Sequence, residues 1–270
     1  MRIATLGDLL LDVVVRLERP LVEGDDVAAE IATAPGGQAA NVAAWATHLG
    51  ARAVFVGRRG GDEAGRLVTE GLAAHGVAVR GPIGGRNGVV VSTVGPDGNR
   101  SMASDRGVAT ELRKQDLDPV WFFECAWLHV AGYSLLCEPI ATAAIHAAML
   151  TRAYGRVSVD LSASTAIETL GGARFRELLD AVQPDLIFGT ETELEAIGGV
   201  FPAPEWVLKR GPHGIAVGRN GETHHYPAEP AEVVDTTGAG DALAAGYLLA
   251  GPELALEAAA LCVAKVGAMP

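Results

Sequence analysis

Cysteine is scarce in this sequence, with three residues (Cys125, Cys137 and Cys262) among 270. Because their number is odd and their spacing is wide, they provide neither a disulfide framework nor the paired ligands of a zinc site. The N-terminal segment also lacks the basic start and the small-residue cleavage site of a secretory signal, since Asp8 and Asp12 interrupt its apolar residues. We therefore expect a reduced protein of the cytoplasm.

Positively charged residues are also few. Lys and Arg total 21 against 33 Asp and Glu, which gives a formal net charge of −12. This acidic balance argues against nucleic acid or an anionic membrane as the main partner, although a local nest of backbone N–H groups can still bind phosphate. No uncharged apolar run approaches the roughly 20 residues that a membrane span requires. We expect small-molecule partners, with no nucleic acid and no membrane.

Hydrophobic residues make up 49% of the chain, which is typical of a globular protein. Short apolar segments alternate with Ala- and Leu-rich stretches of helical length, a pattern that predicts parallel strands covered by helices on both faces. The expected strands are residues 2–6, 53–57, 126–130, 157–160, 186–189, 206–209 and 215–218. The expected helices include residues 38–49, 64–75 and 139–153. We expect residues 1–270 to form a single domain.

Two segments, residues 12–34 and 86–105, interrupt this alternation because they contain no clear helix. Residues 89–94 (VVVSTV) are β-branched and end at Gly95-Pro96-Asp97-Gly98, a strong turn signal. We expect both segments to form strands of a separate small sheet, a lid beside the main domain.

The stretch from residue 232 to residue 250, EVVDTTGAGDALAAGYLLA, carries the clearest chemical signal. It predicts a short strand at residues 232–234, a turn of small residues and then an amphipathic helix. Small residues let the backbone approach a ligand closely, and a helix N-terminus offers unpaired N–H groups at the positive end of the helix dipole. The stretch therefore predicts an anion site suited to a transferring phosphoryl group.

Asp241 lies in the first turn of that expected helix, where its carboxylate can accept the proton of an attacking hydroxyl. We expect the helix dipole to keep Asp241 ionised and hence a weak base, which phosphoryl transfer tolerates. Acidic residues are common in first helical turns for the same dipole reason, so a G-x-G-D turn alone favours a structural role. The longer string DTTGAGD, residues 235–241, is far more specific.

At this string the chain resembles the ribokinase-like sugar kinases of the PfkB family. Four further segments resemble the family's signatures in the family's order, so that the resemblance spans residues 3–268. They are PGGQAAN (35–41), GRRGGDEAG (57–65), ETELE (191–195) and KRGPHG (209–214). The resemblance implies a three-layer α/β/α sandwich with a small β-sheet lid. It also implies an ATP-dependent kinase that phosphorylates a hydroxymethyl group of a sugar, with Mg²⁺ arriving on ATP.

The same resemblance implies the site residues. The implied catalytic base and anion hole are Asp241 with Gly238, Ala239 and Gly240. The implied acceptor pocket contains Asp12, Gly36, Gly37 and Asn41. The implied nucleotide side contains Thr190, Glu193, Lys209, Gly211 and Gly214, with Glu193 orienting the water shell of Mg²⁺. Asp235 and Thr237 match positions that hold K⁺ in many members. Without the family, Asp12 fits a solvated loop acid and Lys209 a strand-end surface charge.

Arg106 follows the expected lid strand. It is a candidate for a contact with phosphate or substrate across the lid, and a salt bridge with Asp105 or another acid is an equally good interpretation.

The sequence departs from the family pattern at two places. Thr190 replaces the usual Asn, and residues 160–164 read DLSAS, with Ser162 and Ser164, where many members carry D-x-N-x-R. The missing Arg disfavours an acidic sugar.

Other functions stay open at this point. The Leu-Ser-Ala string at 161–163 and the Ile-Phe-Gly string at 187–189 resemble the adenosine kinases of the same superfamily, which suggests a nucleoside kinase. The low aromatic content of 5% weighs against a stacked base. A non-catalytic sugar or nucleotide sensor is a third interpretation, against which the intact Asp241 weighs. Edge strands of the lid favour a homodimer. We also expect a terminal helix to be missing after residue 268.

Overall fold

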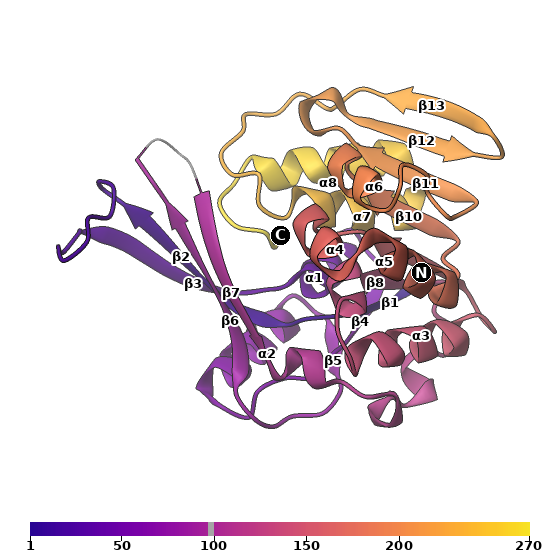
Figure 1. Cartoon of the computed structure of the whole chain (residues 1–270), viewed down its shortest axis with the longest axis horizontal. Coiled ribbons are helices and arrows are strands. Elements are labelled where there is room, and N and C mark those ends of the chain that lie inside the picture. The colour runs from indigo at the N-terminus through magenta and orange to yellow at the C-terminus, as the bar shows by residue number, and fades with distance from the viewer. Residues whose placement is uncertain (97–99) are drawn as a thin grey trace.

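The apolar segments of the chain pair into a nine-stranded sheet within residues 1–96 and 100–270, the part that the computed structural model describes (Figure 1). Its strands are β1 (Arg2–Leu6), β4 (Arg52–Val56), β5 (Ala78–Arg80), β8 (Trp127–Ala131), β9 (Arg156–Asp160), β10 (Leu186–Gly189), β11 (Glu205–Lys209), β12 (Ile215–Arg219) and β13 (Glu222–Tyr226). Their order is β13-β12-β11-β10-β9-β8-β1-β4-β5, and neighbouring strands from β5 to β11 run parallel. The carboxyl ends of these parallel strands therefore meet at one edge of the sheet, where ligands bind in open α/β folds.

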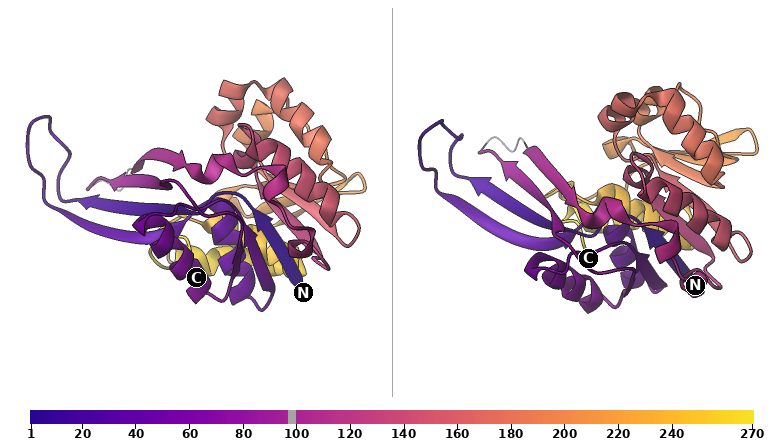
Figure 2. Two further views of the ribbon diagram at one scale, coloured as in Figure 1. Left: turned by 90° about the horizontal axis from the view of Figure 1, so that it is seen from below. Right: turned by 60° about the horizontal axis from the view of Figure 1, so that its bottom comes forward.

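Helices cover both faces of this sheet (Figure 2). One face carries α1 (Gln38–His48), α2 (Glu63–Ala74), α7 (Ala239–Ala250) and α8 (Pro252–Val263). The other carries α3 (Ile140–Thr151), α4 (Ser164–Leu170), α5 (Gly172–Val182) and α6 (Glu191–Ala196). A buried apolar cluster fills each interface, with Trp45 and Phe55 in the first and Phe122 and Phe175 in the second. The predicted three-layer α/β/α fold is confirmed.

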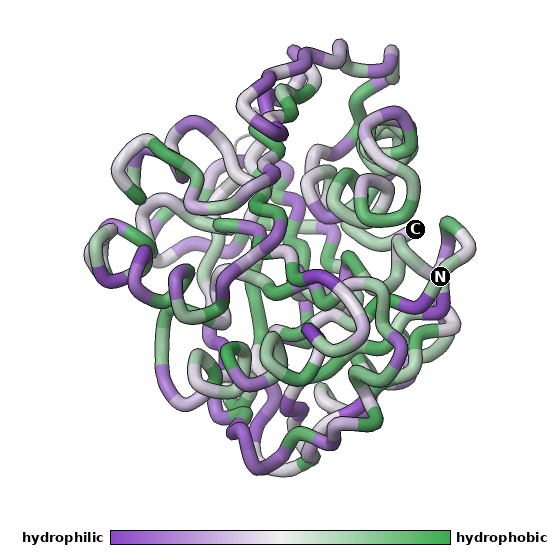
Figure 3. Tube along the Cα trace, turned by 90° about the vertical axis from the view of Figure 1, so that its right-hand side faces the viewer, coloured by the Kyte–Doolittle hydropathy of each residue, from purple (hydrophilic) through white to green (hydrophobic). Residues whose placement is uncertain are grey.

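Hydropathy along the trace agrees with this layering. Hydrophobic residues lie mainly toward the centre of the molecule and hydrophilic residues toward its periphery (Figure 3). Among the described residues, no helix is both long and apolar enough to cross a membrane.

A second, four-stranded sheet extends from the body of the molecule (Figures 1 and 2). Its strands are β2 (Leu10–Leu17), β3 (Ala29–Gly36), β6 (Asn87–Val94) and β7 (Arg100–Gly107), in the order β3-β2-β6-β7. They arise from the two segments in which the sequence shows no helix. The first segment extends two residues beyond both expected bounds, and the second begins one residue later and ends two residues later than expected. Of the expected turn at residues 95–98, Asp97 and Gly98 lie outside the described residues. Asp12 pairs with Val90, and Val90 with Ser104, so these three side chains share one face.

The base of the small sheet is fastened by Asn87, a buried residue at the start of β6. Its Oδ1 accepts from the Gly60 N–H (2.9 Å), and its Nδ2 donates to the Gly88 carbonyl (3.0 Å). The Asn87 N–H donates to Asp62 Oδ2 (3.0 Å), while Asp62 Oδ1 accepts from the Gly65 N–H (3.0 Å) and caps α2. The Gly-rich segment at residues 57–65 therefore holds the small sheet against the body.

The strand predicted at residues 232–234 is wrong: that segment is not a strand in the structure. The N–H groups of Val234 and Asp235 both donate to the carbonyl of Val263 at the end of α8 (2.8 and 3.2 Å). β-propensity predicts the strand, but a helix end rather than a sheet edge is the neighbour that this backbone meets.

The expectation of an all-parallel sheet is wrong at one edge, where β12 runs antiparallel to β11 and β13 to β12. A tight turn at residues 210–214 joins β11 to β12, and Arg210 N–H donates to the Gly214 carbonyl (2.9 Å). So short a connection joins only antiparallel strands, because parallel strands need a long crossover. The polar edge strand β13 is not predicted from the sequence.

We predict that Asn87→Ala lowers the free energy of unfolding by about 2 kcal/mol, because it leaves the buried Gly60 N–H without its acceptor. Urea denaturation measures this loss. Gln115→Ala, at an exposed polar position, is the control and should change stability by less than about 0.5 kcal/mol. An Asn87 variant as stable as this control would contradict the anchoring role.

Candidate active site

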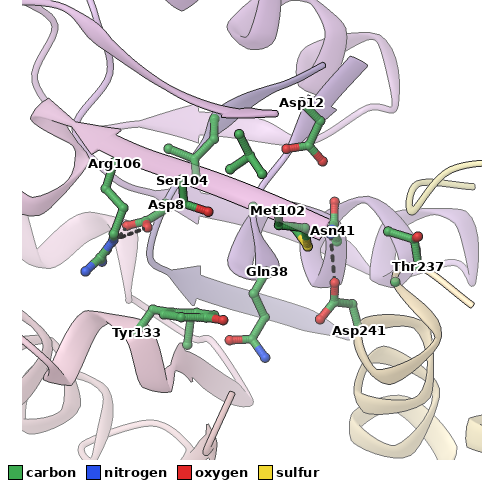
Figure 4. Close-up of a pocket in the computed structure, with 15 residues that line it drawn as sticks. Asp8, Asp12, Gln38, Asn41, Met102, Ser104, Arg106, Tyr133, Thr237 and Asp241 are labelled. Atoms are coloured by element: carbon green, nitrogen blue, oxygen red, sulfur yellow. Dashed lines mark hydrogen bonds and ion pairs between the residues drawn. The ribbon is translucent and has the colours of Figure 1, made fainter. Parts of the chain in front are cut away.

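A cavity of about 260 Å³ lies between the small sheet and the carboxyl end of the central sheet (Figure 4). It brings together residues from β2, α1, β7, the segment after β8 and the start of α7. The lining residues are Asp8, Leu10, Asp12, Gly37, Gln38, Asn41, Val90, Met102, Ser104, Arg106, Ala131, Tyr133, Thr237, Gly238 and Asp241. Seven of the sequence-predicted site residues are therefore in one cavity: Asp12, Gly37, Asn41, Arg106, Thr237, Gly238 and Asp241.

Asp241 is the acid at one end of this cavity, in the first turn of α7. Asp241 is 9% exposed, and Asn41 Nδ2 donates a hydrogen bond to its Oδ2 at 2.7 Å. Burial raises the pKa of Asp241 to about 7; the bond from Asn41 lowers it, Asp160 raises it further, and Lys209 lowers it. The expectation that the helix dipole keeps this acid a weak base is therefore wrong. The dipole contributes at most about 1–2 kcal/mol, whereas loss of water around a buried carboxylate outweighs it.

The N-terminus of α7 supplies backbone donors beside Asp241. Gly238 is in the left-handed region (φ 79°), and a Cβ there would lie 2.6 Å from Ala268, so only glycine fits. The N–H groups of Gly240 and Asp241 fall in the first turn, where an α-helix has no acceptor for them. The Ala239 N–H donates to the Thr236 carbonyl (3.3 Å). This turn can bind an anion through Gly240 and Asp241.

Lys209 lies next to this turn, since its Nζ is 3.7 Å from the position that a Cβ on Gly240 would occupy. The ammonium pairs with both oxygens of the buried Asp160 (2.9 and 2.7 Å) and lies 4.0 Å from Glu193 Oε2. Burial lowers the pKa of Lys209, but the charges of Asp160 and Glu193 outweigh burial and leave it raised. The side chain is therefore a fixed cation beside the N-terminus of α7.

Thr190 and Glu193 form a capping box at the start of α6. Glu193 Oε2 accepts from the Thr190 N–H (2.8 Å), and the Glu193 N–H donates to Thr190 Oγ1 (3.4 Å). Burial raises the pKa of Glu193, and the charge of Lys209 opposes this effect. Gly211 and Gly214 lie in the turn after Lys209, and both have positive φ (54° and 78°). No described contact joins these two glycines to Asp241.

Asp235 organises the loop before α7. Its Oδ1 accepts from the N–H (2.9 Å) and the hydroxyl (2.5 Å) of Thr237, and its Oδ2 accepts from the Gly267 N–H (3.1 Å). The loop is thereby tied to residues 264–270, which form no helix and continue against α1, where Trp45 Nε1 donates to the Ala268 carbonyl (2.7 Å).

Asp12 and the glycine pair pack tightly against each other. A Cβ on Gly36 would lie 2.1 Å from Asp12 Oδ2, and a Cβ on Gly37 (φ 102°) would lie 2.4 Å from the Asp8 carbonyl. Gly36 therefore leaves room for the carboxylate of Asp12, and Gly37 leaves room for the backbone of Asp8.

Arg106 pairs with Asp8, which the sequence analysis did not single out. Its Nε and Nη2 donate to the two oxygens of Asp8 at 2.6 and 2.9 Å. Asp105 instead pairs with Arg86 (2.6 Å), so the suggested Asp105 partner is wrong, while the interpretation of a salt bridge with another acid is confirmed. Arg106 still lines the cavity, near the ring of Tyr133 (6.0 Å).

Several polar residues were not identified as site residues from the sequence: Asp8, Gln38, Ser104 and Tyr133, which line the cavity, and Asp160, which pairs with Lys209. Asp8 and Asp160 each follow or end a buried parallel strand, a position at which an acid reaches the ligand edge of the sheet. That signal was available. For Gln38 and Tyr133 the sequence offers none, because each depends on side chains distant in the chain.

Comparison with known proteins now decides the family. The pfkB family of carbohydrate kinases matches residues 1–269. This chain belongs to that family. The kinase is 31% identical over 268 residues to a fructokinase of Klebsiella pneumoniae, a match that covers 92% of this chain and 83% of that protein. As a family member it is an ATP-dependent carbohydrate kinase.

Solved structures show the same fold. An adenosine kinase from Sinorhizobium meliloti superposes with a TM-score of 0.87 at 24% identity, over 99% of this kinase and 95% of that chain. An uncharacterized sugar kinase from Pyrococcus horikoshii in complex with ATP superposes with a TM-score of 0.83 at 23% identity, over 99% and 95% of the two chains.

We predict that Asp241→Asn stabilises the kinase at alkaline pH. The pKa of Asp241 is about 7 in the folded state and about 3.9 when unfolded. The unfolded chain therefore loses this proton first, and wild-type stability falls as pH rises from about 4 to about 7. Asparagine removes that loss, so the variant should gain about 2–4 kcal/mol over wild type at pH 8. Urea denaturation should show this gain shrinking toward pH 4, and a gain independent of pH would contradict the assignment.

Proposed function

We propose that this kinase transfers the γ-phosphoryl group of ATP to a hydroxymethyl group of a neutral monosaccharide, with Asp241 as the general base. The observation that carries the proposal is the position of Asp241. Its carboxylate, with a pKa of about 7, lies where a sugar-sized cavity meets the N-terminus of α7. A base whose pKa is close to neutral suits proton removal at physiological pH.

In the proposed step, the acceptor hydroxyl oxygen forms a bond to the γ-phosphorus while the bond from that phosphorus to the bridging oxygen breaks. ADP leaves with the electron pair of the broken bond, and the hydroxyl proton passes to Asp241. Phosphoryl transfer depends mainly on positioning and on neutralising charge. We propose that the turn formed by Gly238, Ala239 and Gly240 binds the phosphoryl oxygens through the N–H groups of Gly240 and Asp241, together with the ammonium of Lys209.

We propose that the acceptor pocket is formed by Asp12, Gly36, Gly37, Asn41 and Arg106. Carboxylate and amide oxygens at Asp12 and Asn41 suit sugar hydroxyls, because they accept hydrogen bonds. Asn41 Oδ1 is buried and makes no hydrogen bond within the described residues, which suits a donor on the ligand. The small sheet, whose residues line the cavity, would act as the lid that excludes water.

The acceptor is proposed to be neutral because the charge of Arg106 is already balanced by Asp8 through two short bonds. A compensated guanidinium gives little preference for a carboxylate or a phosphate on the sugar. The cavity of about 260 Å³ also suits a monosaccharide better than a larger ligand. Since a similar protein is a fructokinase, D-fructose is the first acceptor to test.

For the nucleotide we propose Thr190, Glu193, Lys209, Gly211 and Gly214 as contacts. Mg²⁺ would neutralise charge on the phosphates when bound. The donor set fits an ion that keeps most of its water, because no group of three His, Cys, Asp or Glu in the described part of the chain is placed to hold a metal. Glu193, a buried carboxylate beside Lys209, would hold those waters.

A monovalent cation such as K⁺ is proposed near Asp235 and Thr237. The oxygens of this loop lie immediately before the α7 N-terminus, and hydrogen bonds to Thr237 and Gly267 hold the Asp235 carboxylate in place. A cation there would order the loop that carries the anion site.

A nucleoside acceptor is the second candidate. Tyr133 supports it, since this aromatic side chain lines the cavity and is 37% exposed, so that a base could stack on it.

We further propose a homodimer through the lid, whose edge strands β3 and β7 are open to pairing in the described structure. Three free thiols suit a reducing compartment such as the cytoplasm.

We predict that Asp241→Asn lowers kcat for phosphorylation by about 10²–10⁴-fold, because the variant cannot take the hydroxyl proton. Coupled ADP release with D-fructose, D-ribose and adenosine as acceptors measures the rate. Wild-type kcat should fall as pH drops below about 7, as Asp241 becomes protonated. A variant that keeps more than a third of wild-type kcat on its acceptor would exclude Asp241 as the base.

We predict that Asp8→Asn shifts acceptor preference toward sugar acids, because it leaves the Arg106 charge without its partner. The ratio of kcat/KM for 2-keto-3-deoxygluconate to that for D-fructose should rise by about tenfold. Asp105→Asn is the matched control, since Asp105 pairs with the exposed Arg86 outside the cavity. An unchanged ratio in the Asp8 variant would show that Asp8 does not set the charge preference.

A further inference from the structure

Gln38 is a cavity residue to which the proposed function assigns no role. It is the first residue of α1 and occupies a variable position of the Gly-Gly-x-x-x-Asn signature. Its side chain lines the cavity, and Figure 4 shows the amide in the space between Tyr133 and Asp241. The amide oxygen, Oε1, accepts a hydrogen bond from Ser162 Oγ at 2.5 Å.

Ser162 is itself held firmly. Its backbone is in the left-handed region (φ 74°), and its N–H donates to Asp160 Oδ1 at 3.0 Å. Its hydroxyl oxygen accepts from the Gly132 N–H at 2.9 Å. The one hydroxyl proton has two acceptors within reach, and Gln38 Oε1 at 2.5 Å is nearer than the Asp160 carbonyl at 3.0 Å. Asp160 in turn is fixed by its ion pair with Lys209. The donor that meets Gln38 therefore belongs to a partly buried network of hydrogen bonds that ends at the buried Asp160.

This contact sets the direction of the Gln38 amide. With Oε1 bound to a hydroxyl donor, the two N–H bonds of Nε2 are left for other acceptors. None of the hydrogen bonds described for the protein uses them. Because Gln38 lines the cavity, its Nε2 is a donor available to a ligand there.

We propose that Gln38 is a specificity-determining residue, whose Nε2 donates a hydrogen bond to an oxygen of the acceptor sugar close to the hydroxymethyl group that is phosphorylated. Ser162 is the positioning residue that fixes the amide with its nitrogen toward the sugar. The inference rests on the proposed function. It also gives a role to Ser162, which stands where many members of the family carry Asn.

The first test is Gln38→Met, which keeps the length of the side chain and removes the donor. With D-fructose, or with the best acceptor of the panel above if fructose is not turned over, we expect KM for the acceptor to rise about five- to tenfold. We expect KM for ATP and kcat to change by less than about twofold. An unchanged acceptor KM, or a rise confined to ATP, would overturn the proposal.

The second test is a double-mutant cycle with Ser162→Gly, which removes the hydroxyl and suits the left-handed backbone. Alone, it should raise acceptor KM about two- to fivefold. In the Gln38→Met background it should have no further effect, because its influence passes through the amide. Equal effects in both backgrounds would show that Ser162 does not position Gln38.

Ser164→Ala is the control, since the Ser164 side chain makes none of the described hydrogen bonds, and it should leave both KM values unchanged. Thermal melts of all variants check folding.

Failure of the proposed function and failure of the role of Gln38 give different results. If the proposed function is wrong, wild type itself turns over none of the acceptors and binds none of them in calorimetry. If only this inference is wrong, wild type is active and Gln38→Met matches its acceptor KM.

Discussion

The burial of one carboxylate governs this structure. Asp241 lies at the N-terminus of α7, where the backbone favours negative charge, yet packing against α1 removes the water that would stabilise that charge. The single hydrogen bond from Asn41, at 2.7 Å, offsets part of the loss and fixes the direction of the carboxylate. A group held in this balance is ready to accept a proton and costs the fold stability when it is ionised.

The rest of the site is arranged around the same constraint. The small sheet covers the proposed acceptor side of Asp241, and the Asn87 network fixes the base of this sheet to the body. On the proposed nucleotide side, Asp160 holds Lys209 beside Gly240. Asp160 also contacts Ser162, which meets Gln38 in the acceptor cavity. The buried Asp160 thus joins the two sides of the site, through its ion pair with Lys209 and its hydrogen bond with Ser162.

Much of the fold and part of the site could be predicted from the sequence, because they depend on residues close together in the chain. Alternating strands and helices predicted the layers, and the DTTGAGD string predicted a donor-rich turn with an acid beside it. What failed depends on contacts distant in the chain. The raised pKa of Asp241 comes from burial, which the bond from Asn41, 200 residues away, opposes only in part. The Arg106–Asp8 pair joins residues 98 apart. The contact between Gln38 and Ser162 spans 124 residues. The prediction of a strand at residues 232–234 failed for a similar reason, because the pairing of a segment depends on the elements that lie next to it.

The central claim is that Asp241 titrates near neutral pH in the folded kinase, and a direct titration tests it. Carboxyl ¹³C NMR of protein labelled at aspartate, with Asp241→Asn to identify the resonance, measures that pKa without any assumption about the acceptor. We predict a midpoint of about 7 for Asp241. A midpoint near the ordinary aspartate value of about 3.9 would mean that the carboxylate is ionised throughout, and would contradict the account.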